Sequence, residues 1–208
     1  MKKLKIPEQT IERLPLYLRR SEELFSKGKE SVTSDQFVKD LPGINSDNLR
    51  KDLSYFGNYG KKGHGYDITE LHEELGNILK LHVETEVALI GVGNLGKALL
   101  THGEFNRWGF MITAAFDRDP EVIGERIGEV IVQPIQNLDE KVEKEDIQVG
   151  MVAVPEKSAQ QVADTLVSAG IKGILNFAPV LLEVPESITV KQVDIMSKLK
   201  ELKYYIDE

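Results

Sequence analysis

A short apolar run followed by closely spaced glycines constrains this chain more than any other feature. Residues 86–93 read EVALIGVG, and Gly91, Gly93 and Gly96 follow the pattern G-x-G-x-x-G. In such a loop the first glycine permits a tight turn, the second lets the backbone approach a pyrophosphate, and the third lets helix and strand pack closely. Amide groups at the start of the following helix then face the phosphates. The sequence predicts a dinucleotide-binding loop made of Gly91, Val92, Gly93, Asn94, Leu95 and Gly96.

The residues around this loop alternate between strand and helix patterns. Apolar runs recur at 110–117 (FMITAAFD), 147–155 (IQVGMVAVP) and 171–177 (IKGILNF), with helical stretches at 95–102 and 158–170. Apolar runs that do not alternate with polar residues are typical of strands buried on both faces. The pattern predicts an α/β fold with a Rossmann-type doubly wound parallel sheet over residues 86–194.

A carboxylate at the end of the second run indicates which dinucleotide fits. Asp117 lies 21 residues after Gly96, where a carboxylate can accept both ribose hydroxyls of an adenosine and repels a 2′-phosphate. We therefore favour NAD(H) over NADP(H), although the neighbouring Arg118 weakens that preference. The alternative is a glycine turn beside an exposed aspartate.

The charge of the chain is distributed unevenly. The 208 residues carry a net charge of −8, but residues 1–66 hold 13 Lys and Arg against 9 Asp and Glu, and the other 142 hold 13 against 25. A basic module joined to an acidic one suggests a nucleic-acid contact confined to one end, and chance clustering is the alternative.

Helical patterns and a glycine-rich hairpin fill the basic end. A first helix over 8–27 has Ile11, Leu14, Leu18 and Phe25 at helical spacing, although Pro15 should kink it or delay its start. A short helix follows through Phe37 and Val38, and another begins at a cap at position 45 or 46, with Leu49, Leu53 and Phe56 on one face. Residues 57–68 suit a hairpin and 69–81 a connector helix. This order predicts a winged helix.

Cations are placed on the third helix and at the hairpin tip. Arg50 can bind guanine O6 and N7 as a bidentate pair, and Lys51 can reach the same acceptors or a phosphate. A glycine-rich tip with Lys61 and Lys62 can enter the narrow minor groove. The alternative is a solvated helix face with a lysine-rich turn. The candidate DNA-binding residues are Ser46, Arg50, Lys51, Tyr59, Lys61, Lys62, Gly63 and His64.

The stretch RKDLSYFGNYGKKGHGY (50–66) closely resembles the winged-helix signature of the Rex family, the NADH-responsive transcriptional repressors of bacteria. The similarity continues in RLPLYLR (13–19), GVGNLGKAL, AAFDRDP, GIKGILNFAPV and VDIMSKLKELKYYI, and covers nearly the whole chain in the same order.

The resemblance implies roles for particular residues. Arg50 and Lys51 would contact bases, with Lys62 and Gly63 at the minor groove. The loop 91–96 would hold the pyrophosphate and Asp117 the adenosine ribose. Arg19 and Asp194 resemble a charged pair that changes partners between the family's two states. Some relatives have a tyrosine where this chain has His102, so the bond that senses the ligand would differ here. The residues bordering the nicotinamide would be Val154, Pro155, Asn176, Phe177, Ala178 and Pro179.

An apolar stripe closes the sequence. It consists of Ile195, Leu199, Leu202 and Ile206 at helical spacing. The stripe could pack on its own domain, or insert into a partner chain as the resemblance implies. The expected organisation is a DNA-binding domain at 1–68, a connector at 69–85, a dinucleotide domain at 86–194 and a dimerisation helix at 195–208.

We expect a regulator, not an enzyme. The chain has no cysteine, no apolar run long enough for a membrane span and no secretory signal, which fits a cytoplasmic protein, and no metal is expected. The prediction is a homodimer that binds palindromic operator DNA when NADH is scarce relative to NAD+, and leaves it when NADH, the effector with which NAD+ competes, binds. The alternatives are a small NAD-dependent oxidoreductase and a CoA- or nucleotide-binding domain without DNA binding.

Overall fold

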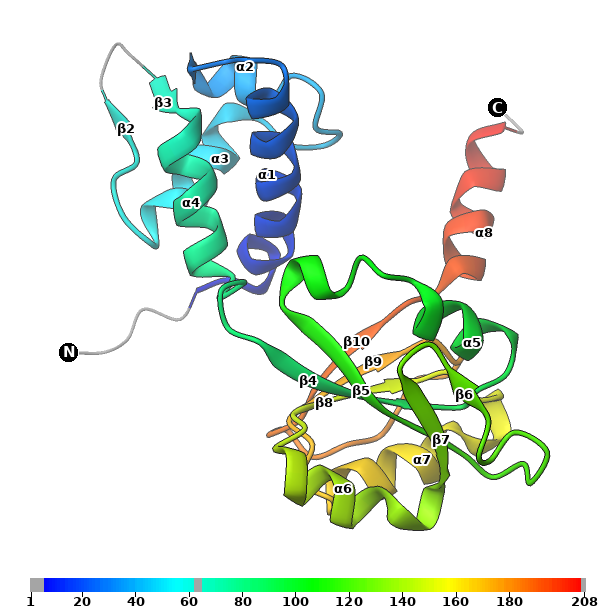
Figure 1. Ribbon diagram of the computed structural model, residues 1–208. Coiled ribbons are helices and arrows are strands. Elements are labelled where there is room, and N and C mark those ends of the chain that lie inside the picture. The colour runs from blue at the N-terminus through cyan, green and yellow to red at the C-terminus, as the bar shows by residue number, and fades with distance from the viewer. Residues whose placement is uncertain (1–5, 62–64, 207–208) are drawn as a thin grey trace. The chain divides into compact units, whose positions relative to one another are not determined.

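The computed structural model describes residues 6–61 and 65–206. The chain forms two compact units, Met1–His82 and Val83–Glu208, and each is considered by itself. Figure 1 shows a helical N-terminal unit with a small sheet and a C-terminal unit built on a larger sheet.

The first helix of the N-terminal unit, α1 (Glu8–Ser26), is continuous through Pro15. The helix begins at Glu8, so the expected alternative of a start delayed to Pro15 is wrong; the buried face of this long helix offsets the backbone hydrogen bond that a proline removes. A kink at Pro15 stays a prediction. The buried face also differs from the predicted one. Ile11 and Phe25 are exposed, whereas Tyr17 and Leu24 are buried with Leu14 and Leu18.

The rest of this unit is a winged helix, as predicted. A three-stranded antiparallel sheet in the order β1-β3-β2 forms the wing, so the hairpin has a third strand that the sequence reading missed. The last helix, α4, packs against α1 and belongs to the same compact unit. The bounds are β1 (Ser31–Val32), α2 (Ser34–Val38), α3 (Ser46–Ser54), β2 (Gly60–Lys61), β3 (Gly65–Asp67) and α4 (Ile68–Ile78).

The C-terminal unit contains a seven-stranded sheet in the order β10-β9-β8-β4-β5-β7-β6 (Figure 1). All neighbouring strands are parallel except the short edge strand β6, which runs antiparallel to β7. The order from β7 to β10 is that of a doubly wound dinucleotide fold, and it reverses at β4. The bounds are β4 (Thr85–Ile90), β5 (Phe110–Asp117), β6 (Arg126–Ile127), β7 (Val130–Pro134), β8 (Val149–Val152), β9 (Gly173–Asn176) and β10 (Thr189–Gln192).

Apolar residues cover both faces of this sheet. One core joins the strands to α6 and α7, and a second joins them to α5. Strands buried on both faces explain why the sequence shows continuous apolar runs at this point. The helices are α5 (Asn94–Thr101), α6 (Leu138–Glu145) and α7 (Glu156–Ser168), with 3-10 turns at η1 (Asn106–Trp108) and η2 (Ile135–Asn137).

The final helix, α8 (Ile195–Ile206), follows β10 and buries none of its residues. Asp194 caps it, because its carboxylate accepts hydrogen bonds from the Ser197 amide at 2.8 Å and the Ser197 hydroxyl at 2.5 Å. The predicted stripe lies on this helix, and its four residues are 51–71% exposed. The stripe therefore does not pack on its own domain in this structure, and insertion into a partner chain stays a prediction.

Candidate functional site

A cavity of about 700 Å³ opens at the carboxyl ends of the central strands. It lies where the strand order reverses, because the loops after β5 and β8 reach it from opposite sides of the loop after β4. Ligands of open α/β sheets bind at such a point. The lining residues are Ile90, Gly91, Gly93, Asp117, Arg118, Asp119, Ile135, Gln136, Ala153, Val154, Pro155, Ser158, Gln161, Val162 and Thr165.

The three glycines of the loop are small for different reasons. Gly91 has φ +95°, and a Cβ there would lie 2.6 Å from the Ala153 carbonyl oxygen. A Cβ on Gly96 would lie 2.1 Å from the Gly91 carbonyl oxygen. Gly93 differs, because its φ of −74° suits any residue and, apart from Gly93 itself and its two chain neighbours, no residue has an atom within 4 Å of a Cβ there. The protein itself does not require a glycine at this position, so the open space at Gly93 fits a ligand whose phosphates approach the backbone.

Asp117 connects the predicted ribose position to the glycine loop. Its Oδ2 accepts a hydrogen bond from the Val92 amide at 2.6 Å, and its Oδ1 accepts from the amides of Arg118 and Asp119. A carboxylate has about four lone-pair sites, and these three bonds leave one for a hydroxyl donor. The arrangement holds the carboxylate at the end of β5 in one orientation.

The loop after β9 is held by a network that the sequence reading missed. Asn176 is fully buried, and its Nδ2 donates to the Val180 carbonyl and to Gln192 Oε1, both at 2.8 Å. Gln192 in turn donates to the Ala178 carbonyl at 2.6 Å. Both amide hydrogens of Asn176 are thus committed within the protein, so this side chain fixes the loop that carries Phe177 and Pro179. No pattern in the sequence identifies Gln192.

The structure brings some of the predicted cofactor residues into the cavity and leaves others outside its lining. Those that line it are Gly91, Gly93, Asp117, Arg118, Val154 and Pro155. Val92 and Gly96 are buried residues of the loop, whereas Asn94, Leu95 and His102 are exposed on α5 and at its end. Five polar lining residues were not foreseen, because no motif marks them as ligand contacts: Asp119, Gln136, Ser158, Gln161 and Thr165.

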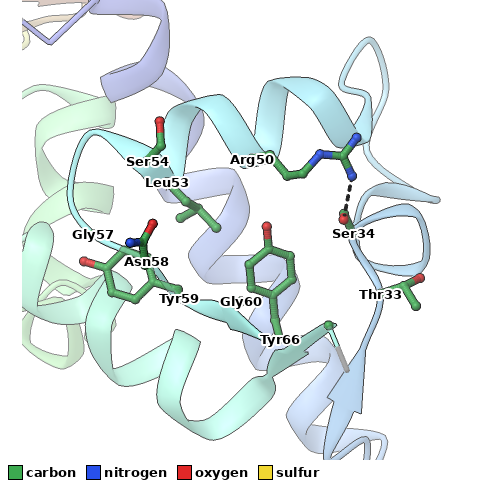
Figure 2. Close-up of a pocket in the computed structure, with 11 residues that line it drawn as sticks. Thr33, Ser34, Arg50, Leu53, Ser54, Gly57, Asn58, Tyr59, Gly60 and Tyr66 are labelled. Carbon is green, nitrogen blue, oxygen red and sulfur yellow. Dashed lines mark hydrogen bonds between the residues drawn. The ribbon is translucent and has the colours of Figure 1, made fainter. Parts of the chain in front are cut away.

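The other predicted surface is on the N-terminal unit. Asn45 caps α3 and forms a reciprocal hydrogen-bonded pair with Asn48, which fixes the start of this helix. Arg50 and Lys51 are exposed, whereas Leu49 and Leu53 are buried. Figure 2 shows the hollow of about 570 Å³ that separates α3 from the wing, with Arg50 and Tyr66 on its walls.

The Arg50 guanidinium is held by neighbouring polar groups. Nη1 donates to Ser34 Oγ at 2.9 Å, a bond drawn in Figure 2, and Nη2 donates to Asp47 Oδ1 at 2.7 Å. A longer contact of 3.4 Å joins Nη2 to Ser46 Oγ. The hydrogen bond to Asp47 raises the pKa of Arg50, so its charge is constant at any physiological pH. Asp47 and Ser34 were not predicted as partners of Arg50, although the i, i+3 spacing of Asp47 and Arg50 can be read from the sequence.

A buried carboxylate fixes α3 against α1. Asp52 is 1% exposed and accepts hydrogen bonds from Thr10 Oγ1, Arg13 and the Tyr17 hydroxyl, at 2.6–2.8 Å. Burial alone would raise the pKa of Asp52, but the bonds from Arg13, Tyr17 and Thr10 hold it below its usual range. The three donors lie on one face of α1, so this cluster sets the rotation of α3 and the direction in which Arg50 and Lys51 point.

Only part of the predicted wing can be located. Tyr59 is half-buried before β2, and its hydroxyl donates to the Phe56 carbonyl at 3.0 Å. The backbone of Lys61 ends β2. Lys62, Gly63 and His64 lie outside the described residues. Their predicted contacts with DNA remain predictions.

Two family models match the chain, one for each unit. The model described as "Putative DNA-binding protein N-terminus" matches residues 5–54, and the model described as "CoA binding domain" matches residues 82–180.

Full-length relatives decide the family. The chain is 41% identical over 207 residues to the "Redox-sensing transcriptional repressor Rex" of Syntrophobacter fumaroxidans, which covers 99% of this chain and 98% of that protein. The chain belongs to the Rex family. It is also similar to crystal structures of the Rex-family repressor RSP. The complex of RSP with β-NAD+ and operator DNA has a TM-score of 0.92 and 33% identity, covering 97% of this chain and 93% of RSP. The complex with β-NADH has a TM-score of 0.90 and 32% identity, covering 98% and 95%.

Membership of the Rex family confirms the resemblance that was read from residues 50–66 and the dinucleotide loop, and with it the two-part fold. Within residues 6–61 and 65–206, no helix combines the length and apolarity needed to cross a bilayer. The same described residues contain no group of three or more His, Cys, Asp or Glu that could hold a metal ion.

Proposed function

We propose that this Rex-family chain is a redox-sensing repressor whose winged helix binds palindromic operator DNA and whose dinucleotide domain binds NADH as the signal for release. The observation that carries the proposal is the pairing of two surfaces in one chain: a capped α3 that presents Arg50 and Lys51, and a glycine-loop cavity with Asp117 at its rim. The similar repressor RSP has been crystallised with operator DNA and NAD+, and with NADH.

The residues of the cavity fit a dinucleotide. The open space at Gly93 and the amides at the start of α5 would hold the pyrophosphate, and Asp117 would accept a hydrogen bond from an adenosine ribose hydroxyl. Val154 and Pro155, after β8, would border the nicotinamide on the other side of the loop. The other residues of the loop 91–96 are proposed on the glycine motif, and Arg118 on its place in the lining of the cavity. The predicted residues proposed on the resemblance alone are His102, Asn176, Phe177, Ala178 and Pro179.

The charge of the nicotinamide ring explains how the two redox forms would be told apart. NAD+ and NADH share the whole ADP half, but only the oxidised ring is cationic. Asp117 and Asp119, the carboxylates that line the cavity, lie at the end of β5. Val154 and Pro155 follow β8, which is on the other side of β4 and its glycine loop. A cation placed among apolar side chains loses hydration without a compensating charge, so the reduced ring binds better.

Operator DNA and NADH affect each other's binding through thermodynamic linkage. A homodimer presents two α3 helices to two half-sites whose spacing must match the protein. NADH favours a conformation in which the spacing no longer matches, and by reciprocity DNA weakens NADH binding by the same factor. The exposed α8 stripe is proposed as the dimer contact, and Arg19 and Asp194 as the pair that changes partners. The domain limits given above are part of this proposal.

A repressor of this kind needs no catalytic group, and we propose that the chain is not an enzyme. Its operator lies in the cytoplasm of a bacterium, where we place the protein. Since one family model is described as a CoA binding domain, CoA is the second ligand to test.

Binding of a fluorescent duplex tests the proposal. Wild-type protein first selects its palindrome from a random duplex library, and anisotropy then follows release of this duplex by NADH, NAD+ or CoA. We expect release by NADH at concentrations where NAD+ and CoA have little effect. Arg50→Gln should abolish specific binding and keep NADH binding, and Gly93→Val should do the reverse. The proposal would be refuted if the wild-type protein selected no sequence from the library, or if the selected duplex stayed bound at saturating NADH.

A further inference from the structure

A carboxylate stands on the surface that should meet a polyanion. Asp47, in the first turn of α3, has a side chain that is 88% exposed, one helical turn before Arg50. DNA carries one negative charge about every 1.7 Å along its axis, so an acidic side chain at this position opposes binding to any duplex. The presence of Asp47 on this surface is therefore not explained by affinity for DNA.

The contacts of Asp47 suggest that reason. Its Oδ1 is 2.7 Å from Arg50 Nη2, and the other guanidinium terminus donates to Ser34 Oγ at 2.9 Å. Ser34 is the first residue of α2, whose start is fixed by reciprocal hydrogen bonds between Thr33 and Gln36. The guanidinium is therefore held from two sides: by the Asp47 carboxylate of its own helix, and by the Ser34 hydroxyl on a neighbouring helix, the bond that Figure 2 draws.

We propose that Asp47 is a specificity-determining residue of the DNA-binding surface: with Ser34 it holds the Arg50 guanidinium in one position and so prevents Arg50 from serving as a general phosphate contact. The inference deepens the proposed function and rests on it, because it concerns how the same surface separates its operator from other DNA.

The physical argument compares two complexes. On a random duplex, a free arginine would turn to the nearest phosphate and add a sequence-independent contact. Bound to Asp47, Arg50 forms a pair with no net charge and gains little from that phosphate. On the operator, the bonds to Ser34 and Asp47 and the longer contact with Ser46 use three of the five guanidinium N–H donors, and two remain for guanine O6 and N7. The contribution of Arg50 thus depends on the base that it meets, which is how an interface discriminates against wrong partners.

The test measures the ratio of affinities for two duplexes. One contains the palindrome selected by wild-type protein, and the other is a scrambled duplex of the same length and composition. For Asp47→Asn we expect about three- to tenfold tighter binding to the scrambled duplex, and a dependence of log K on log salt that is steeper by about 0.9, since one more phosphate is neutralised. Affinity for the palindrome should change by less than about twofold, so the ratio falls.

Asp35→Asn is the matched control. Asp35 lies in the first turn of α2 and acts on Arg50 only through its charge, so the substitution changes the same net charge at the start of a neighbouring helix without removing a hydrogen bond to Arg50. It should tighten binding to both duplexes by the same factor. Ser34→Ala, which removes the second contact without changing the charge, should lower the ratio in the same direction as Asp47→Asn.

Three results would overturn the proposal. In the first, Asp47→Asn tightens binding to both duplexes by the same factor, as Asp35→Asn does. The ratio of the two affinities is then unchanged, so Asp47 acts only through its charge. In the second, binding to the palindrome falls while binding to the scrambled duplex stays constant, so Asp47 itself contacts a base. In the third, in an Arg50→Gln background, Asp47→Asn still tightens binding to the scrambled duplex by more than Asp35→Asn does, so Arg50 is not the intermediary. Thermal melting of each variant confirms folding at the assay temperature. If wild type selects no palindrome, the proposed function fails first, and the two failures are distinct.

Discussion

Replacing Asp52 by alanine should loosen the DNA-binding unit and leave the dinucleotide unit intact. In the wild-type protein this carboxylate accepts from Thr10, Arg13 and Tyr17 in an almost fully buried position. The alanine variant keeps the three donors and removes their common acceptor. An arginine that loses its buried partner is left with an uncompensated charge.

The magnitude follows from the burial of the two partners. Removing one member of a buried ion pair costs about 3–5 kcal/mol. The Arg13 side chain is 23% exposed, so water can reach its guanidinium and reduce the loss to about 2–4 kcal/mol. That range corresponds to an increase of about 30- to 1,000-fold in the opening equilibrium of the unit.

Hydrogen exchange followed by mass spectrometry measures this opening separately in each unit. Amides of α1 and α3 should exchange faster in Asp52→Ala by the factor given, whereas those of β4 and β5 should keep their wild-type rates. Asp47→Ala is the control, because it removes an exposed carboxylate from the same helix. Exchange in α1 and α3 within about threefold of that control would refute the account of Asp52.

The pH dependence has a defined sign. Since the pKa of Asp52 is lowered in the folded protein, its stabilisation is complete above the unfolded value of about 3.9 and disappears as the pH falls through the folded value. The difference between wild type and Asp52→Ala should therefore be constant from pH 5 to 8 and shrink below about pH 4. A difference that already declines near pH 6 would show that another group controls this contact.

Three further substitutions test the other parts of the molecule. Gly93→Val should weaken NADH binding at least about tenfold with an unchanged melting temperature. Gly96→Ala should lower the melting temperature, because its Cβ would lie 2.1 Å from the Gly91 carbonyl oxygen. Equal melting temperatures for the two variants would contradict this distinction. Gln192→Ala leaves a buried Asn176 donor without its partner and removes one of the two hydrogen bonds to the Ala178 carbonyl, so calorimetry should show weaker NADH binding and unchanged ADP-ribose binding; equal losses for both ligands would place the effect elsewhere. Leu199→Glu puts a charge in the exposed stripe of α8 and should shift sedimentation from dimer to monomer; a variant that sediments like wild type would exclude this stripe as the dimer contact.

The sequence identified the parts of the fold that rest on local rules. The glycine loop, the four apolar runs and the helix cap near position 45 are patterns of a few residues, and each appears where it was expected. Short elements were missed for the same reason. Strands of two residues such as β1 and β6 depend on their neighbours in the sheet, and nothing in their own residues distinguishes them from turns.

The polar networks could not be predicted, because they join residues far apart in the chain. Asp52 bonds to partners 35–42 residues away, and Asn176 bonds to Gln192 16 residues away. On α1, the hydrophobic spacing was read around Ile11 and Phe25, but the side that carries Thr10 and Tyr17 is buried. A buried threonine and a buried tyrosine there make sense only once Asp52 is opposite them.

The proposed role of α8 as the dimer contact would make protein abundance a second variable beside the nicotinamide ratio. An isolated helix of twelve residues is marginal in water, and this one gains no burial from its own unit. Its order would thus come from the surface that covers it, which we take to be another copy of the chain. At low protein concentration the dimer would dissociate and α8 would unwind. The two half-sites of the operator would then no longer be bound by one dimer. Repression would then rise more steeply than in proportion to copy number, so a cell could adjust the sensitivity of the sensor by how much of it is synthesised.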